Sequence, residues 1–288
     1  MWPYDIGIPI KDIATLKKLP AWKVMPATAE EISEWLVVES IESKVDRVER
    51  PTVLYHPSLK DKKTRVTIRL QGFVESINLA PLGNWDGKEH TAGGTLQHLT
   101  LTDGGLTKVF KHQLDSLDEL HYAILSFMRH DTHELDRPSE CPNICLGHRV
   151  FHKIPLVNRK QILNALRAGD DPTGKAAKIC ERWRVPFRIG LGVQHEDGKI
   201  VRTTQLAVRK GDFMDVSFMP KIVTLRSRQG VQYMVKFDIQ EVVRLFTRNE
   251  LSDKVLSLLQ PELAERGMSP IEDADSGFLY EDSGHAIN

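Results

Sequence analysis

The sequence contains only three cysteines: Cys141, Cys145 and Cys180. An odd and sparse set of cysteines is not typical of a secreted protein held together by disulfides. No stretch of the chain reaches the roughly 18–20 consecutive apolar residues that a transmembrane helix needs. The first ten residues contain no basic segment followed by an apolar core, so we expect no signal peptide. These absences predict an intracellular protein, cytoplasmic or nuclear, that does not span a membrane.

The chain also lacks an excess of charge of either sign, because 39 Lys and Arg balance 39 Asp and Glu. This balance excludes a protein that is basic along its whole length, but the charges are unevenly placed. Residues 199–236 include eight basic and two acidic residues, whereas residues 250–288 include two basic and nine acidic residues. The sequence therefore predicts a basic segment followed by an acidic C-terminal tail.

A bent strand is predicted over residues 64–79. Val66, Ile68 and Leu70 alternate with polar residues, which is typical of a strand with one buried face. Gly72 lies inside the run, and a glycine within a strand indicates a bulge or a sharp bend.

The next elements are two strands and a helix. Residues 95–103 predict a second strand, and Gly104-Gly105 predict a turn into a third at 107–111. A capping box that begins at Ser116 and an apolar face at helical spacing predict a helix over 116–129.

This order of elements resembles the OB-fold, in which a long, bent first strand is followed by two strands and a helix that fills a gap in the barrel. The resemblance covers about residues 64–157. It implies that the second and third strands form a surface that binds single-stranded nucleic acid or another extended ligand. An OB-fold has two strands after the helix, whereas the sequence offers one, within 148–157.

The second half of the chain is predicted to be an antiparallel sheet flanked by helices. The predicted strands are 187–193, 200–208, 213–225 and 231–237. The predicted helices are 158–168, 173–183, 239–246 and 252–263, in addition to an N-terminal helix over 28–48 that begins with a capping box at Thr28.

The fold class expected from these elements is α+β and β-rich, with an OB-like barrel half and a C-terminal antiparallel sheet with flanking helices. We expect four domains or segments. They are an N-terminal arm and helix at 1–50, an OB-like domain at 51–157, a domain of helices and antiparallel sheet at 158–265, and an acidic disordered tail at 266–288.

Basic residues on or beside the predicted strands are candidates for contact with nucleic acid, because single-strand-binding surfaces combine Lys and Arg with aromatic stacking platforms. Trp85 belongs to this set as an aromatic residue in a polar loop, where it would either anchor a satellite cluster or contact a ligand. The candidates are Arg65, Arg69, Trp85, Lys88, Lys108, Lys111, Arg202, Arg209, Lys210, Arg226 and Arg228.

Two other patterns are weighed against this interpretation. Cys141, Cys145, His148 and His152 are residue types that bind zinc, but their spacing matches no familiar zinc finger, so we expect little or no metal. Residues 169–176 have the glycine spacing of a P-loop, but Ala176 stands where a hydroxyl is needed. We therefore expect no cofactor.

The sequence predicts non-catalytic binding of single-stranded nucleic acid through a basic, aromatic-containing β surface. The acidic tail is a candidate docking element for a protein partner, and self-association into a homo-oligomer stays open. The alternative is a structural or assembly protein such as a viral coat or scaffold subunit. A zinc-dependent enzyme that uses the His and Cys residues is the third alternative.

Overall fold

The computed structural model describes residues 25–26, 28–42, 49–55, 64–128, 142–154, 164–227 and 230–251. The chain divides into two compact units, Met1–Arg248 and Asn249–Asn288, and every element named below lies in the first. The N-terminal arm before residue 25, the helix predicted at 252–263 and the acidic tail lie outside the described residues.

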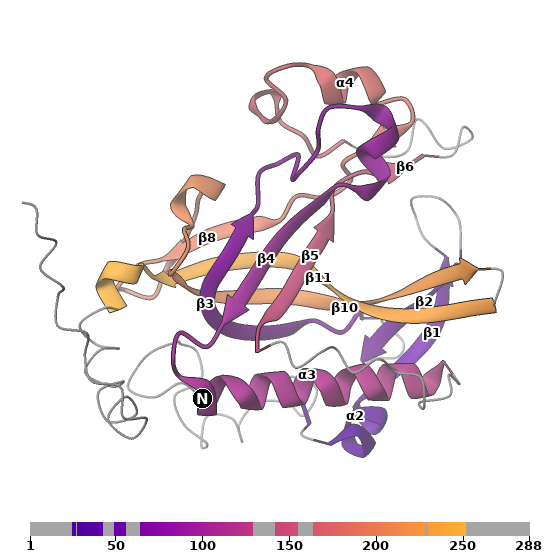
Figure 1. The fold of residues 1–288 in the computed structure, drawn as a ribbon, viewed down its shortest axis with the longest axis vertical. Coiled ribbons are helices and arrows are strands. Elements are labelled where there is room, and N and C mark those ends of the chain that lie inside the picture. Colours follow the sequence, from indigo (N-terminus) through magenta and orange to yellow (C-terminus); the bar gives the residue numbers. More distant parts are fainter. Residues whose placement is uncertain are drawn as a thin grey trace, which may run out of the picture. The chain divides into compact units, whose positions relative to one another are not determined.

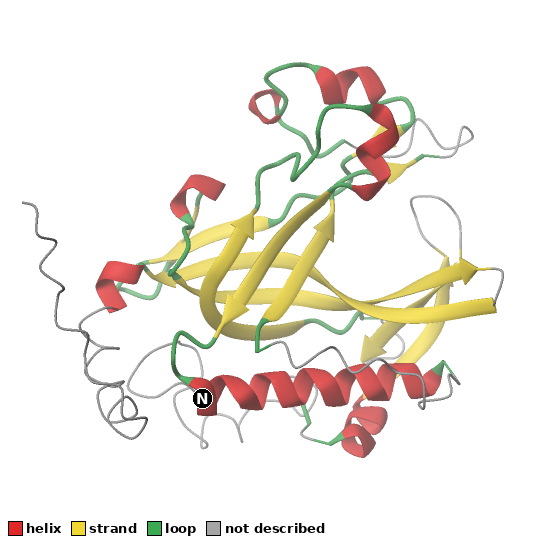
Figure 2. Ribbon diagram, in the orientation of Figure 1, coloured by secondary structure: helices red, strands yellow, loops and turns green. Residues whose placement is uncertain are grey.

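The described chain is β-rich, with short helices between the strands (Figure 2). The strands are β1 (Leu36–Glu42), β2 (Glu49–Tyr55), β3 (Ile68–Asn78), β4 (Leu96–Thr102), β5 (Ile144–Arg149), β6 (His152–Lys153), β7 (Trp183–Arg184), β8 (Gly190–Gln194), β9 (Ile200–Arg202), β10 (Phe213–Ser227) and β11 (Gly230–Phe246). The α-helices are α2 (Ala29–Trp35), α3 (Thr107–Phe127) and α4 (Lys175–Ile179), and the 3-10 helices are η3 (Glu89–Gly94), η6 (Ala168–Asp170) and η7 (Gln205–Ala207).

Five strands close into a barrel (Figure 1). β3 pairs with β4, β4 with β5, β5 with β11, β11 with β10, and β10 pairs back with β3. Of these five barrel pairs, β5–β11 is parallel and the other four are antiparallel. This closed arrangement confirms the predicted fold class, α+β with an OB-like barrel. Because β10 and β11 follow residue 157 in the chain, the barrel takes strands from both of the segments that the sequence assigned to separate domains.

The last two barrel strands are much longer than the others and continue beyond the barrel as a two-stranded ribbon. Their antiparallel register runs from the Phe213–Phe246 pair to the Ser227–Gly230 pair. On one side of the barrel, β2 joins the outer edge of β10, and β1 pairs with β2. On the other side, β8 pairs in parallel with β11, and β9 extends the sheet.

The bend predicted at Gly72 is present in β3. β3 pairs with β10 up to Phe73 and with β4 from Phe73 onward, and its register with β4 shifts between Val74 and Ser76. A Cβ atom at Gly72 would lie 3.0 Å from the Phe110 ring and 3.1 Å from Leu101 Cβ. Glycine therefore allows β3, β4 and α3 to approach closely at the bend.

α3 lies along one side of the barrel and contributes to its core (Figure 1). Phe110, Leu117, Leu120 and Ile124 are buried at helical spacing and pack with the apolar residues of β3, β4, β10 and β11. The strand predicted at 107–111 is therefore wrong, because these residues form the first turns of α3. Burial of Phe110 on the helical face outweighs the β propensity of the short segment.

Two more predicted helices contain strand where helix was expected. α2 begins at the predicted capping box, where the Thr28 hydroxyl accepts from the Glu31 N–H, but the chain then pairs as β1 with β2 from Leu36 onward. Residues 239–246, predicted as a helix, continue β11. Gln240 is an extra residue in the register between β10 and β11. Such a bulge interrupts the alternation of buried and exposed residues along the strand, so the buried residues are spaced as on a helix.

The remaining predicted helices are shorter than expected or absent in the described residues. Of the helix predicted at 173–183 only α4 is helical, and residues 164–167 of the helix predicted at 158–168 are not helical. Among the described residues, no helix has the length and apolar content needed to cross a membrane.

A small lobe with its own apolar cluster lies where β3 joins β4 and where β5 ends (Figure 1). We define the lobe as residues 80–95, 150–154 and 164–188. It contains η3, α4 and the β6–β7 pair. Its buried residues are Ala92, Val150, Phe151, Ala176 and Val185, with Trp85 and Trp183 packed against them.

Candidate nucleic-acid interface

Five of the predicted binding cations are engaged in ion pairs within the chain, and the longest of these pairs joins Lys88 Nζ to Asp86 Oδ2 at 3.9 Å. The other four are shorter: Arg69 with Asp215 (2.6 Å), Lys111 with Asp115 (2.7 Å), Arg202 with Glu241 (3.3 Å) and Lys210 with Glu75 (2.8 Å). A cation that is already paired with a carboxylate gains less from a phosphate than an unpaired cation does. These four are therefore weaker candidates than the sequence alone implied.

Arg69 has the most extensive of these contacts. Its Nε and Nη2 atoms donate to the two oxygens of Asp215 at 3.0 and 2.6 Å, and Gln71 Nε2 also donates to Asp215 Oδ2 at 2.9 Å. Asp215 is buried, with 3% of its side chain exposed, whereas Arg69 is 54% exposed. The hydrogen bonds to Asp215 raise the pKa of Arg69 above its ordinary value. The pair therefore joins β3 to β10 across the outside of the barrel.

The other predicted cations are spread over separate parts of the chain. Arg65 precedes β3, and Arg209 lies in the turn before β10; both are exposed. Lys108 is in the first turn of α3, close in the chain to the end of β4. The backbone of Arg226 belongs to β10, but its side chain is not among those described, and Arg228 lies outside the described residues.

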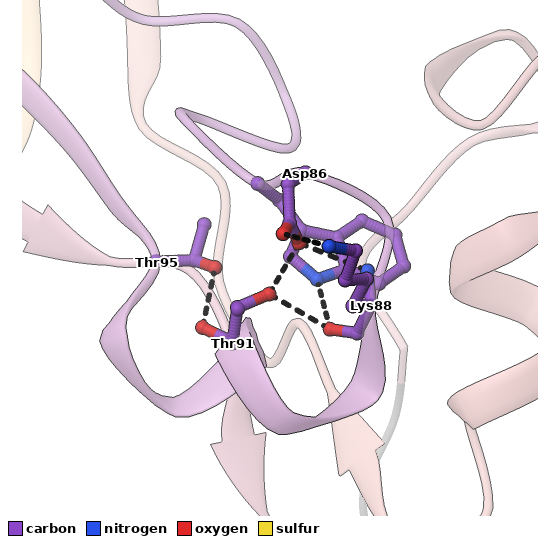
Figure 3. Close-up of polar contacts among 5 residues, drawn as sticks. Asp86, Lys88, Thr91 and Thr95 are labelled. Atoms are coloured by element: carbon purple, nitrogen blue, oxygen red, sulfur yellow. Dashed lines mark hydrogen bonds and ion pairs between the residues drawn. The ribbon is translucent and has the colours of Figure 1, made fainter.

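The loop before β4 holds Trp85 and Lys88 in a network of hydrogen bonds (Figure 3). Asp86 accepts from the Thr91 hydroxyl and from the Lys88 N–H, and the Trp85 Nε1–H donates to the Lys88 carbonyl at 2.8 Å. The hydrogen bond from Thr91 lowers the pKa of Asp86 most, followed by that from the Lys88 backbone. The Trp85 ring lies 4.8 Å from that of Phe151, so Trp85 anchors the lobe cluster.

β10 and β11 place two lysines opposite each other. Lys221 and Lys236 are partners in the antiparallel register, so their side chains leave the same face of the ribbon. Like charges directly opposite each other destabilise a strand pair. An anion bound between them would offset this repulsion, which makes the pair a strong candidate for contact with phosphate.

His152, at the start of β6, lies within the electrostatic range of Lys221 and of Arg149, the last residue of β5. Burial lowers the pKa of His152 to about 4, with further lowering by Lys221 and His148 and an opposing effect of Asp238. His152 is therefore neutral at pH 7. We refer to Arg149, Lys221 and Lys236 as the cation cluster.

One carboxylate lies beside the cation cluster. Asp238 Oδ1 is 2.8 Å from His148 Nδ1, and Asp238 Oδ2 is 3.8 Å from Lys221 Nζ. Burial acts to raise the pKa of Asp238, but the His148 hydrogen bond and Lys221 outweigh it, so the pKa lies below its ordinary value. Asp238 thus offsets part of the Lys221 charge. Within the part of the chain that the structure describes, Arg149 and Lys236 have no carboxylate partner.

Apolar side chains lie next to the cation cluster. Val223 and Met234 are partners on β10 and β11, each two residues from a lysine of the pair, so they share its face. Leu225 follows on the same face of β10 and is exposed. Phe187 is 37% exposed, and its ring centre lies 5.3 Å from that of His148. The cation cluster with Phe187, Val223, Leu225 and Met234 forms the candidate interface.

The predicted zinc ligands that are described do not converge. Cys145 is exposed on the outer face of β5, whereas His148, three residues on and therefore on the other face, is buried against Asp238. Cys141 lies outside the described residues. In the described ranges, no three His, Cys, Asp or Glu side chains are grouped so that they could hold a metal ion.

Sequence reasoning did not select Arg149, Phe187, Lys221 or Lys236 as site residues. For the two lysines a signal was present, because a short link joins the predicted strands 213–225 and 231–237, and the register that pairs Ser227 with Gly230 also pairs Lys221 with Lys236. For Arg149 and Phe187 no local signal existed, because only the closed barrel brings the end of β5 beside the ribbon.

No protein family model matches the chain, and no curated protein does. Among solved structures, the chain is similar to the single-stranded DNA-binding protein from bacteriophage Enc34, with 11% identity, 73% of this chain and 90% of that chain covered, and a TM-score of 0.30. It is also similar to gp2.5, a single-stranded DNA-binding protein encoded by bacteriophage T7, with 10% identity, 66% and 97% covered, and a TM-score of 0.35.

Proposed function

We propose that this protein binds single-stranded nucleic acid, without catalysis, through the candidate interface on β5 and the β10–β11 ribbon. The observation that carries this proposal is the cross-strand pair of Lys221 and Lys236, with Arg149 nearby, on the outside of an OB-like barrel. OB-folds use the face of their second and third strands and the loops beside it to bind oligonucleotides. In this barrel those strands are β4 and β5, and Arg149 at the end of β5 is the member of the candidate interface that lies on them.

The neighbouring apolar side chains favour a single strand over a duplex. Nucleobases in a single strand are free to lie on apolar and aromatic side chains, whereas those of a duplex are stacked within it. Phe187, Met234 and Leu225 offer such a surface beside the lysines. Phosphate contacts from the lysines and base contacts from these residues together would bind a strand with little dependence on sequence.

The decisive experiment is a titration of labelled oligo-dT and oligo-U at two salt concentrations, for the natural protein and for Lys221→Ala/Lys236→Ala. We expect salt-sensitive binding by the natural protein. The double variant should bind more weakly and lose about 1.4 from the slope of log affinity against log salt, because a single strand releases about 0.7 ion per neutralised phosphate.

Lys199→Ala/Arg248→Ala is the charge-matched control. Both residues are exposed. Lys199 immediately precedes β9, and Arg248 follows the C-terminal end of β11. The control should keep the natural affinity and slope. An unchanged slope in the Lys221/Lys236 variant would contradict the proposal. Self-association of the natural protein without salt-sensitive binding, measured by sedimentation, would instead favour the structural or assembly alternative.

Phe187→Ala should weaken binding of oligo-dT by about tenfold, because loss of one base–aromatic stack costs about 1–3 kcal/mol. The salt slope should stay unchanged, since no phosphate contact is removed. Phe187→Trp is the control and should keep the affinity. Equal affinity of the Ala variant and the natural protein, measured by fluorescence anisotropy, would exclude Phe187 as a stacking residue.

A further inference from the structure

On the lobe, Lys175 lies against the backbone of the loop that carries Lys88, although the two lysines are distant in the sequence. Lys175, the first residue of α4, extends across Gly87, so that a Cβ atom at Gly87 would lie 2.7 Å from Lys175 Cδ and 3.0 Å from Lys175 Nζ. Gly87 has a φ of 87°, a backbone conformation that glycine adopts most readily. Lys88 is the next residue. The loop therefore places the exposed Lys175 side chain against the backbone immediately before Lys88, which is also exposed.

The carboxylates around these lysines are largely engaged elsewhere. Asp86 accepts from Thr91 and from the Lys88 backbone, and its Oδ2 lies 3.9 Å from Lys88 Nζ. Both of those side chains are exposed, and an exposed pair at this distance is strongly screened by water. Glu89 pairs with Arg182 at 3.2 Å. Within the described ranges, Lys175 has no carboxylate partner.

The two lysines are also connected to the candidate interface through packed residues. Arg149, a member of the cation cluster, is the last residue of β5, and Phe151 follows two residues later. Phe151 packs on Trp85, whose indole N–H donates to the Lys88 carbonyl. Since each of these contacts is short, the lobe holds Lys88 in a fixed place near the end of β5.

We propose that Lys88 and Lys175 form a second phosphate-binding contact for the same single strand, which continues from the candidate interface onto the lobe. This inference rests on the proposed function. It makes the affinity depend on the length of the oligonucleotide. A short oligonucleotide would fill the candidate interface, and only a longer one would reach the lobe.

The test compares Lys88→Ala/Lys175→Ala with the natural protein on oligo-dT of about 8 and about 30 nucleotides, lengths that bracket the site size of one OB-fold. With the longer strand we expect a several-fold rise in Kd and a salt slope lower by about 1.4, for two phosphate contacts at about 0.7 each. With the shorter strand the Kd should not change. Lys199→Ala/Arg248→Ala is again the control.

The possible results separate this inference from the proposed function. If the lobe variant binds both lengths like the natural protein while Lys221→Ala/Lys236→Ala is impaired, the second contact is refuted and the proposed function stands. If the lobe variant loses affinity equally for both lengths, the extension onto the lobe is also refuted. If the natural protein binds neither length, the proposed function itself fails. A circular dichroism melt for each variant confirms that it is folded.

Discussion

Replacing Arg69 with methionine is expected to lower the free energy of unfolding by about 3 kcal/mol, in the range measured when one partner of a buried ion pair is removed. Among the described residues, the substitution would leave the Asp215 carboxylate, which is only 3% exposed, with the hydrogen bond from the Gln71 side chain. The reverse change, Asp215→Asn, should cost less, because Arg69 is 54% exposed and can be hydrated once its partner is neutral. Urea unfolding of the two variants measures this asymmetry.

The double variant Arg69→Met/Asp215→Asn completes the cycle. It has no buried charge at position 215, so it should recover a large part of the stability that Arg69→Met loses. If Arg69→Met were no less stable than the natural protein, the pair would be a surface contact of little energetic weight. Arg69 would then again be a candidate for phosphate, as the sequence suggested.

Replacing Phe151 with alanine is expected to destabilise the lobe by about 3–5 kcal/mol, which is the usual cost of truncating a buried phenylalanine. Phe151 is fully buried at the centre of the lobe cluster and contacts the Trp85 ring. This cluster is separate from the barrel core, so the loss should appear as local opening of the lobe. Amide exchange should accelerate in η3 and α4 and stay slow in β3 and β4.

Leu206→Ala provides a matched control for this substitution. The Leu206 side chain is 77% exposed, so its truncation should change stability by no more than about 0.5 kcal/mol. Uniformly faster exchange in Phe151→Ala, in the barrel strands as well as in the lobe, would show that the lobe and the barrel unfold together. The lobe would then not be an independent unit of stability.

The positions of several elements could be predicted from the sequence because local patterns specify them. Alternation in 64–79 and 95–103 identified β3 and β4, and Gly72 marked the bend. The run 213–225 predicted β10 almost to its last residue, since it is rich in apolar and β-branched residues, with Met214, Val216 and Phe218 alternating on one face. Each of these features depends on residues within a few positions of one another in the chain, so the sequence is sufficient to predict it.

Elements whose pattern is ambiguous were decided by tertiary contacts. Residues 107–111 could pair as a strand by composition, but burial of Phe110 beside Gly72 makes them part of α3. Residues 239–246 have helical spacing because Gln240 and Leu245 are extra residues in the β10–β11 register. In both cases the energy of packing against the barrel exceeds the small local preference.

The candidate site shows the same division between local and long-range information. Trp85 and Lys88 could be singled out because they lie in a polar loop, and the hydrogen bonds that hold them there join residues within a few positions of one another. Arg69 and Arg202 looked equally suitable, yet the sheet places Asp215 and Glu241 beside them. A charge in the sequence does not show which opposite charge will lie next to it, because cross-strand neighbours are distant along the chain.

The sequence by itself determined the fold class, the bend in β3 and the capped start of α2, because each depends on local backbone preferences and on apolar spacing. Only the tertiary structure decided that β10 and β11 close the barrel begun by β3, β4 and β5, and that Arg149 and Lys221 both come within electrostatic range of His152. The physical reason is that a closed barrel satisfies the hydrogen bonds of both its edge strands. That closure depends on all five strands at once and is contained in no single segment.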